Sequence, residues 1–200
     1  MNMKSTWMAC LLLMLGCVSG IAKDNKTNKY KLVWQDDFKG KTFDAKSWSK
    51  IRRDGPDWKR HMSYDDRLYE VKDGNLILYG VNNDGSYKYD LNGDGQLEAD
   101  TARFVTGGLY TKHKRTIEYG KVEVRAKLGQ AQGAWPAIWM LPDRDVAWPI
   151  GGEIDIMEHL NFDPMAYQTV HTHYTHTLKQ DSNPPHFATG KIDTNGYNVY

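Results

Sequence analysis

The clearest pattern of hydrophobic and polar positions lies in the segment 151–159, with the sequence GGEIDIMEH. Glu153 and Asp155 are two residues apart, so on a β-strand their side chains share one face. The two isoleucines of the segment and Met157 are expected to face a core. Strict alternation would put residue 157 on the acid face, so Glu158 reaches that face only if one extra residue forms a β-bulge. The segment therefore predicts a bulged strand with three carboxylates on one side.

Alternation and turn residues predict further strands, and the Asp73–Gly74 step is a hairpin signal. In the segment 121–127, Val and Ala alternate with charged residues, which indicates a half-buried antiparallel strand. A helical interpretation of 153–158 is weaker, because a Gly-Gly pair precedes the segment and its neighbours are β-rich. From the pattern alone the chain is an antiparallel β protein. The other predicted strands cover residues 30–38, 68–71, 75–81, 106–111, 134–141, 168–174 and 197–200.

The N-terminal residues have the features of a secretory signal, with Lys4 as the basic start and Trp7–Leu15 as the apolar run. That run is too short to cross a membrane. The sequence MLGC ending at Cys17 resembles a bacterial lipobox and predicts lipidation of that thiol; ordinary cleavage near Gly20 is the alternative. We expect a cell-surface or periplasmic lipoprotein, or otherwise a secreted protein. The predicted organisation is a signal peptide at 1–20, a linker at 21–29 and an incomplete domain at 30–200.

Composition and charge narrow the function further. The chain of 200 residues allows one domain with a sizeable core. Its net charge of +1 creates no global field that would steer it to nucleic acid or to a membrane surface. Aromatic residues make up 12% of the chain, which suits a β protein that stacks on sugar rings, although cores alone can absorb them. Both cysteines lie in the leader, so no disulfide is expected in the domain.

Three carboxylates on one face repel each other, and the segment 151–159 contains no Lys or Arg to offset them. One reason to keep them together is to separate their pKa values, so that one acid stays protonated while another is ionised. Retaining glycosidases use such a pair, with carboxyl groups about 5–5.5 Å apart. A solvated acidic strand or a metal site is the alternative.

The sequence EIDIME at 153–158 resembles the signature of glycoside hydrolase family 16, in the bulged form found in laminarinases and related β-glucanases. The resemblance implies an antiparallel β-sandwich jelly roll of the concanavalin-like type, of which this chain would lack the last strands. It continues, in the family's order, through LVWQDDF at 32–38, DGNL at 73–76, YGKVEVRAK at 119–127 and GAWPAIWMLP at 133–142.

The resemblance implies endo-hydrolysis, with retention, of a β-1,3-glucan or a mixed-linkage β-1,3/1,4-glucan. Glu153 would be the nucleophile, Glu158 the acid/base and Asp155 the residue that tunes Glu153. A β-galactan hydrolase of the agar type, a transglycosylase and a non-catalytic surface glycan-binding lipoprotein are the alternatives. A polysaccharide is the expected partner of a monomer that touches the membrane only through its lipid anchor.

Several residues are candidates for sugar binding. Trp135 and Trp139 lie four apart on a predicted strand and would form a platform about 13 Å long, or about two to three sugar units; both could instead be core. Trp148 is a third candidate. An adjacent strand could set His171 beside the carboxylates. Members of the resembled family often carry a sugar-binding arginine at or near position 109, and Arg103 is a candidate for that contact. Further candidates in an irregular stretch are Trp58, Arg60 and His61.

Two stretches resemble metal sites. Asp90, Asn92 and Asp94 are spaced like the first ligands of an EF-hand calcium loop. Thr101 replaces the closing Glu, so a hairpin loop between two strands is the favoured interpretation. We expect catalysis to need no cofactor, with calcium in a structural role at most. A histidine patch could also chelate a metal across a strand; it comprises His171, His173 and His176.

Overall fold

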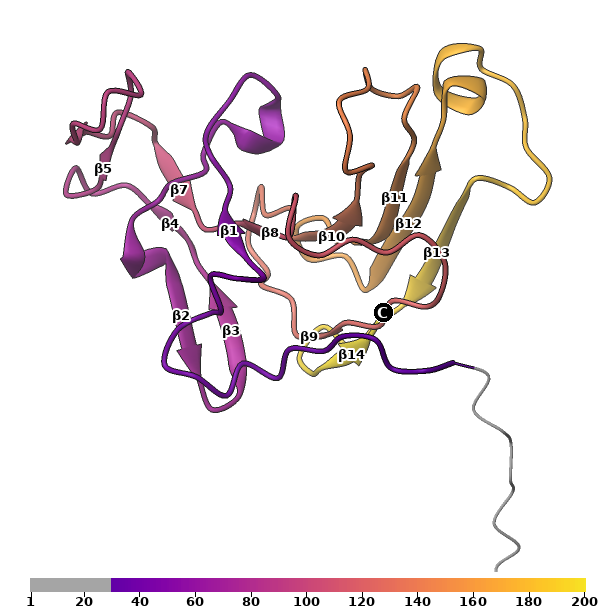
Figure 1. Ribbon diagram of the computed structural model, residues 1–200, viewed down its shortest axis with the longest axis horizontal. Helices are drawn as coiled ribbons and strands as arrows, with labels where there is room; N and C mark the ends of the chain where they lie inside the picture. Colours follow the sequence, from indigo (N-terminus) through magenta and orange to yellow (C-terminus); the bar gives the residue numbers. More distant parts are fainter. Residues whose placement is uncertain (1–29) are drawn as a thin grey trace, which may run out of the picture. The chain divides into compact units, whose positions relative to one another are not determined.

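A computed structural model of the chain describes residues 30–200 (Figure 1). The predicted signal peptide, Cys17 and the linker at 21–29 lie outside the described residues. Trp34–Tyr200 form one compact unit, and all of the strands named below lie in it. Across residues 30–200, no helix has the length and apolar character needed to cross a bilayer.

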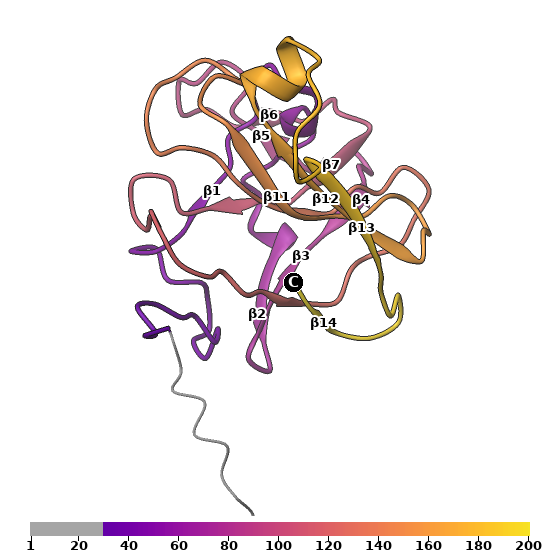
Figure 2. The ribbon, with the colours of Figure 1, turned by 90° about the vertical axis from the view of Figure 1, so that its right-hand side faces the viewer.

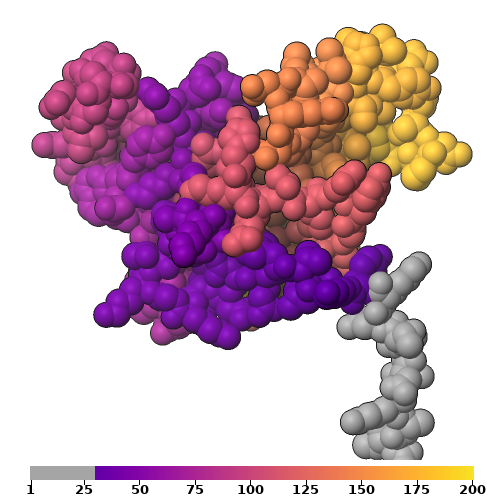
Figure 3. Space-filling view, in the orientation of Figure 1, coloured from indigo at the N-terminus to yellow at the C-terminus, as the bar shows by residue number. Residues whose placement is uncertain are grey.

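The largest sheet is antiparallel and has its four strands in chain order, as both ribbon views show (Figures 1 and 2). Because consecutive strands are neighbours, each connection returns the chain directly to the growing edge. In the space-filling view, the orange and yellow segments that carry this sheet lie side by side (Figure 3). The strands are β10 (Ala137–Met140), β11 (Glu153–Glu158), β12 (Met165–His171) and β13 (Phe187–Lys191).

β11 contains the predicted bulge. Asp155 lies opposite Thr169 of β12, whereas Glu158 lies opposite Tyr167, so three steps on β11 match two on β12. The extra residue is also visible against β10, where the register shifts by one between Ile138 and Trp139. The prediction of one inserted residue is confirmed.

The core under the sheet lies on the face opposite the carboxylates. Met157 is 1% exposed and packs with Leu128 and Ala166. Ile154 is 48% exposed, so the prediction that it faces a core is wrong. Partly buried side chains that pack against this cluster come from β9, from β10 and from the residues that directly follow β13 and β14; they are Ala126, Ile138, Ile192 and Tyr200.

The remaining strands form antiparallel pairs. The Asp-Gly hairpin is confirmed: Lys72 pairs with Asn75, and both loop residues have positive φ, 50° for Asp73 and 70° for Gly74. The pairs are β1 (Ser49–Lys50) with β8 (Leu109–Tyr110), β2 (Tyr69–Lys72) with β3 (Asn75–Leu78), β4 (Gly80–Asn82) with β7 (Phe104–Thr106), β5 (Lys88–Tyr89) with β6 (Glu98–Ala99), and β9 (Arg125–Ala126) with β14 (Asn198–Val199). Within residues 30–200 there are three short helices: η1 (Asp57–Lys59), η2 (Asp66–Leu68) and the π-helix η3 (His173–Thr177).

Several predicted strands differ from the structure. The strand predicted at 168–174 ends at His171, and His173 and Tyr174 belong to η3. The strand predicted at 106–111 is divided between β7 and β8, and the one predicted at 75–81 between β3 and β4. Residues 30–38 form no strand, because the Asp36 carboxylate accepts the backbone N–H of Phe38 at 2.9 Å and Phe38 adopts a φ of 47°. This local turn breaks the extended backbone. The predicted strand at 121–127 shrinks to Arg125–Ala126, and Val122 is 38% exposed instead of buried.

Substitution of Met157 tests the bulge through stability. Because Met157 is fully buried, Met157→Ala should lower the free energy of unfolding by about 2–5 kcal/mol. Ile154→Ala on the same strand is the matched control and should cost about 1 kcal/mol or less, because that side chain is half exposed. Urea denaturation measures both, and equal losses would contradict the register described above.

Candidate active site

The three carboxylates share one face of β11. Their opposite residues on β12 are His171, Thr169 and Tyr167, which are spaced by two and therefore lie on a single face of that strand. Residues directly opposite in an antiparallel pair lie on the same side of the sheet. Glu153, Asp155 and Glu158 therefore face the same space, as the bulge predicts.

Glu153 is held at the start of β11 by the chain before it. The indole N–H of Trp148 donates to Glu153 Oε2 at 2.7 Å. Gly152 has a φ of 80°, and a Cβ at Gly151 would clash with Val146, so the glycine pair allows the tight entry into the strand. Burial raises the pKa of Glu153, and the charge of Glu158 adds to the effect, while hydrogen bonds with Trp148 and Asp155 oppose it.

Asp155 is the most deeply placed of the three acids, at 4% exposed. Burial raises its pKa to about 7, and the charges of Glu153 and Glu158 add to the shift, whereas His171 opposes it. His171 Nε2 lies 3.2 Å from Asp155 Oδ2, but this oxygen has no aligned hydrogen-bond partner. The two atoms are therefore close enough for an ion pair, but they are not hydrogen-bonded. A protonated Asp155 can donate a hydrogen bond to Glu153.

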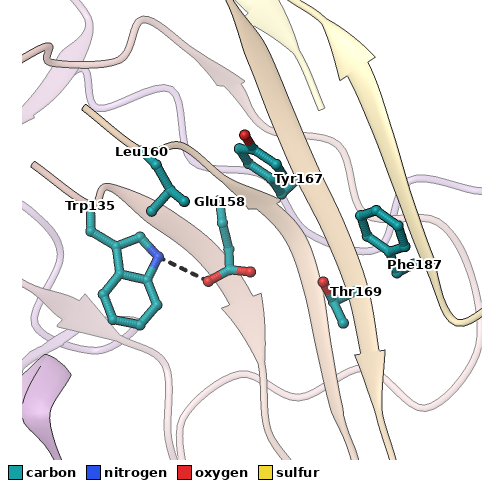
Figure 4. Close-up of a pocket in the computed structure, with 6 residues that line it drawn as sticks. All are labelled: Trp135, Glu158, Leu160, Tyr167, Thr169 and Phe187. Atoms are coloured by element: carbon teal, nitrogen blue, oxygen red, sulfur yellow. Dashed lines mark hydrogen bonds between the residues drawn. The ribbon is translucent and has the colours of Figure 1, made fainter. Parts of the chain in front are cut away.

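Glu158 lies in a pocket of about 190 Å³ on the same face (Figure 4). The indole N–H of Trp135 donates to Glu158 Oε1 at 2.9 Å. Figure 4 shows the rings of Trp135 and Phe187 on either side of Glu158, with Thr169 between the carboxylate and Phe187. The two rings are 50% and 56% exposed, so both are available to a ligand. Leu160 and Tyr167 complete the lining.

Aromatic rings surround the other end of the acid row. Trp148 lies edge-on to His176, with ring centroids 4.4 Å apart, and both rings contact His171. Trp139 is directly opposite Asp155 on β10 and packs edge-on against Trp58 at 4.7 Å. The structure thus brings four sequence candidates to the acids, namely Trp135, Trp139, Trp148 and His171, and a fifth, Trp58, contacts Trp139. Trp135 precedes β10, so the two tryptophans of the predicted platform do not lie on one continuous strand.

Arg103 does not join the site. It lies immediately before β7, its guanidinium is over the ring of Phe104, and no contact among residues 30–200 connects it to the carboxylates. The prediction of Arg103 as a sugar contact is therefore not supported by its position. His61 likewise contacts Phe104, through its ring and through the backbone carbonyl.

The predicted calcium loop is a hairpin excursion between β5 and β6. The carboxylate of Asp90 accepts backbone N–H groups from Gly93, Asp94 and Gly95 at 2.6–3.1 Å. The amide of Asn92 donates to Glu98, and Asp94 accepts from the backbone of Gln96. These contacts occupy the oxygens locally and fit the favoured hairpin interpretation. Calcium binding here stays a prediction.

In the described part of the chain, a single group of side chains could hold a metal ion. Glu153, Asp155 and His171 each offer one ligand atom, and these atoms lie within 4.8 Å of one another. The predicted histidine patch is not such a group: His171 and His176 are in ring contact, but His173 does not join them.

Sequence reasoning missed four pocket residues: Leu160, Tyr167, Thr169 and Phe187. Tyr167 and Thr169 could have been found by pairing the bulged strand with the strand before His171. Phe187 had no signal, because all five residues of β13 are exposed and show no alternation of burial.

The chain is similar to several known proteins over most of its length. Residues 123–198 match the family described as "XgeA-like, catalytic GH16 domain". The keratan-sulfate endo-1,4-beta-galactosidase of Sphingobacterium multivorum is 34% identical over 87% of this chain and 39% of that protein. The beta-glucanase of Rhodothermus marinus is 35% identical over 84% of this chain and 58% of that protein. The X-ray structure of the laminarinase from Rhodothermus marinus has a TM-score of 0.65 and 31% identity, covering 85% of this chain and 66% of the other.

The similarity to the laminarinase structure shows that the fold is the antiparallel β-sandwich jelly roll of this class of glycoside hydrolases. The chain belongs to glycoside hydrolase family 16, as the resemblance of its motifs predicted. It spans less than two thirds of the length of the curated relatives named above.

The raised pKa of Asp155 predicts a pH-dependent stability. With a folded pKa of about 7 against the ordinary 3.8, the folded state keeps a proton that the unfolded state releases between these values. This contribution is therefore largest below about pH 4 and is lost as the pH rises to about 7. Asp155→Asn should flatten the fall in melting temperature across this range, although the raised pKa of Glu153 leaves some slope. Calorimetry at several pH values measures the effect; parallel curves for both proteins would contradict it.

Proposed function

We propose that this chain is the catalytic part of an endo-acting, retaining β-glucanase that cleaves β-1,3- or mixed-linkage β-1,3/1,4-glucan. The observation that carries the proposal is the bulge, which brings Glu153 and Glu158 to one face of the sheet. A retaining enzyme needs two carboxyl groups on the same side of the scissile bond, one as nucleophile and one as acid. Glu153 and Glu158 would fill these two positions, and each acid has its own indole donor.

In the first step, the ionised Glu153 attacks the anomeric carbon while Glu158 gives its proton to the leaving sugar oxygen. The hydrogen bond from Trp148 stabilises the ionised form of Glu153 against the effect of its burial. Trp135 donates to Oε1 of Glu158, which leaves the other oxygen free to carry the proton toward the sugar.

In the second step, Glu158 takes a proton from water, which attacks the glycosyl-enzyme and releases Glu153. Asp155, protonated below about pH 7, donates a hydrogen bond to the Glu153 carboxylate. That hydrogen bond stabilises Glu153 as a leaving group. Asp155 thus acts on the nucleophile and does not itself transfer a proton to the sugar.

The names of two relatives support a glucan as substrate. The matched proteins of Rhodothermus marinus are called a beta-glucanase and a laminarinase. A β-galactan is the second candidate, because the similar protein of Sphingobacterium multivorum is named a keratan-sulfate endo-1,4-beta-galactosidase. Hydrolysis of either glycan would use the same acids. The two glycans differ in the sugar hydroxyls that the surrounding side chains must bind.

We also propose that the chain is exported. The lipobox-like sequence that ends at Cys17 supports a lipid-anchored protein outside the cytoplasm, where the enzyme would encounter polysaccharides. We propose a monomer that contacts the membrane only through this anchor. A structural calcium ion at the Asp90 loop would be an addition to the fold and has no part in the reaction above.

Product profiling tests the function directly. Laminarin and barley glucan should yield oligosaccharides, whereas agarose and keratan sulfate should be cleaved slowly or not at all. NMR of the earliest products should show the β-anomer, because two inversions give retention. Predominant cleavage of keratan sulfate would replace the glucan with the galactan candidate, and longer products from a tetrasaccharide would indicate transglycosylation.

Variants of the two acids serve as controls for this assay. Glu153→Gln and Glu158→Gln should each lower kcat by at least about 10²–10⁴-fold while the circular dichroism spectrum stays unchanged. Glycan binding without cleavage by the unmodified chain would favour the non-catalytic alternative. An α-anomer as first product would contradict the assignment of Glu153 as nucleophile.

The rings on either side of Glu158 predict where the leaving sugars bind. Because Phe187 lines the same pocket as the proton donor, Phe187→Ala should raise KM several-fold, about 1–2 kcal/mol of binding, with little change in kcat. Phe162→Ala is the matched control, since Phe162 is similarly exposed at 60% but does not line the pocket. Kinetics on a soluble glucan separate the two; equal effects would contradict this role.

A further inference from the structure

Glu153, Asp155 and His171 form a compact set of metal-binding donors. One ligand atom from each lies within 4.8 Å of the other two. Metal bonds of about 2.0–2.2 Å in a tetrahedral site place ligand atoms about 3.5 Å apart, so only small side-chain movements are needed. Two neighbouring strands carry the donors, with Glu153 directly opposite His171, which holds the set in place.

Asp155 gives a second, independent indication of a ligand. The residue is 4% exposed, and its Oδ2 atom is buried without a hydrogen-bond partner among the described residues. Buried carboxylate oxygens are normally satisfied, because leaving one unpaired costs free energy. This oxygen lies 3.2 Å from His171 Nε2, a spacing that suits two ligands of one ion. A cation between them would satisfy both atoms.

The donor types select the class of cation. Calcium and magnesium prefer oxygen ligands alone, whereas an imidazole nitrogen with two carboxylates suits zinc and other first-row divalent ions. We propose that Glu153, Asp155 and His171 bind one Zn²⁺-type ion, and that this ion inhibits the enzyme. The inhibitory part rests on the proposed function, because Glu153 is the nucleophile assigned there.

The metal inhibits because it occupies the electron pair of Glu153 that would otherwise attack the sugar. A Glu153 oxygen bound to Zn²⁺ cannot attack the anomeric carbon, and the ion's positive charge opposes the positive charge that develops on the sugar. The ion also fills space that the substrate must enter, so substrate and metal exclude one another. The enzyme would then be active where free zinc is scarce and inactive where it is abundant.

Calorimetric titration of the folded protein with Zn²⁺ tests the site without relying on activity. The unmodified protein should bind one ion tightly, and His171→Gln should weaken this binding at least about tenfold. His173→Gln is the matched control, because His173 is exposed two residues away and lies outside the donor set; its binding should match the unmodified protein. Asp155→Asn is a second ligand variant in case His171→Gln unfolds.

The outcomes separate the metal site from the proposed function. Tight binding that is lost in both ligand variants, with zinc-inhibited and chelator-restored glucan cleavage, supports the whole proposal. The same binding without cleavage of any glycan leaves the metal site standing and overturns the proposed function. Equal zinc binding by the unmodified protein, His171→Gln and Asp155→Asn places the ion elsewhere and overturns the metal site. Absence of tight binding to the unmodified protein also overturns it.

Discussion

A single inserted residue in β11 determines where the three carboxylates point. In a regular strand, Met157 would face the sugar-binding side and Glu158 would be directed into the core beside Leu128 and Ala166. A buried, unpaired carboxylate there would cost several kcal/mol. The bulge exchanges the two residues, so the same insertion completes the core and places the second acid on the open face. Fold stability and the proposed chemistry therefore depend on the same backbone irregularity.

Placing three acids on one face has an electrostatic cost that the surrounding residues offset. Two unit charges about 5 Å apart repel each other by about 3 kcal/mol at an effective dielectric constant of 20. A hydrogen bond to a charged group contributes about 1.5–3 kcal/mol, which is the same size. One indole donor for Glu153 and one for Glu158 can therefore balance much of the repulsion. Asp155 has no such donor and keeps its proton instead.

Local chemistry made much of this structure predictable. The position of Met157 in the alternation predicted the bulge, and Asp73–Gly74 predicted the hairpin, because both depend on a few adjacent residues. The positions of residues relative to distant parts of the chain were harder to predict. Arg103 was a candidate for sugar binding, but it precedes β7, which pairs with β4 outside the four-stranded sheet. Phe187 lies on a strand without alternation of burial. Tertiary contacts decide such positions, and single-sequence patterns do not encode them.

The order of β10 to β13 has a consequence for how such a domain can change. Both acids, their indole donors and the ring of Phe187 all come from one uninterrupted stretch of chain, 135–187, folded as a meander. The long connection between β12 and β13 carries η3, and its His176 contacts Trp148 and His171 at one end of the acid row. Insertions in that connection could change the residues around the site while the positions of Glu153 and Glu158 stay the same. A portable unit of this kind is suited to recombination, in which new glycan preferences arise by exchanging loops around an unchanged reaction centre.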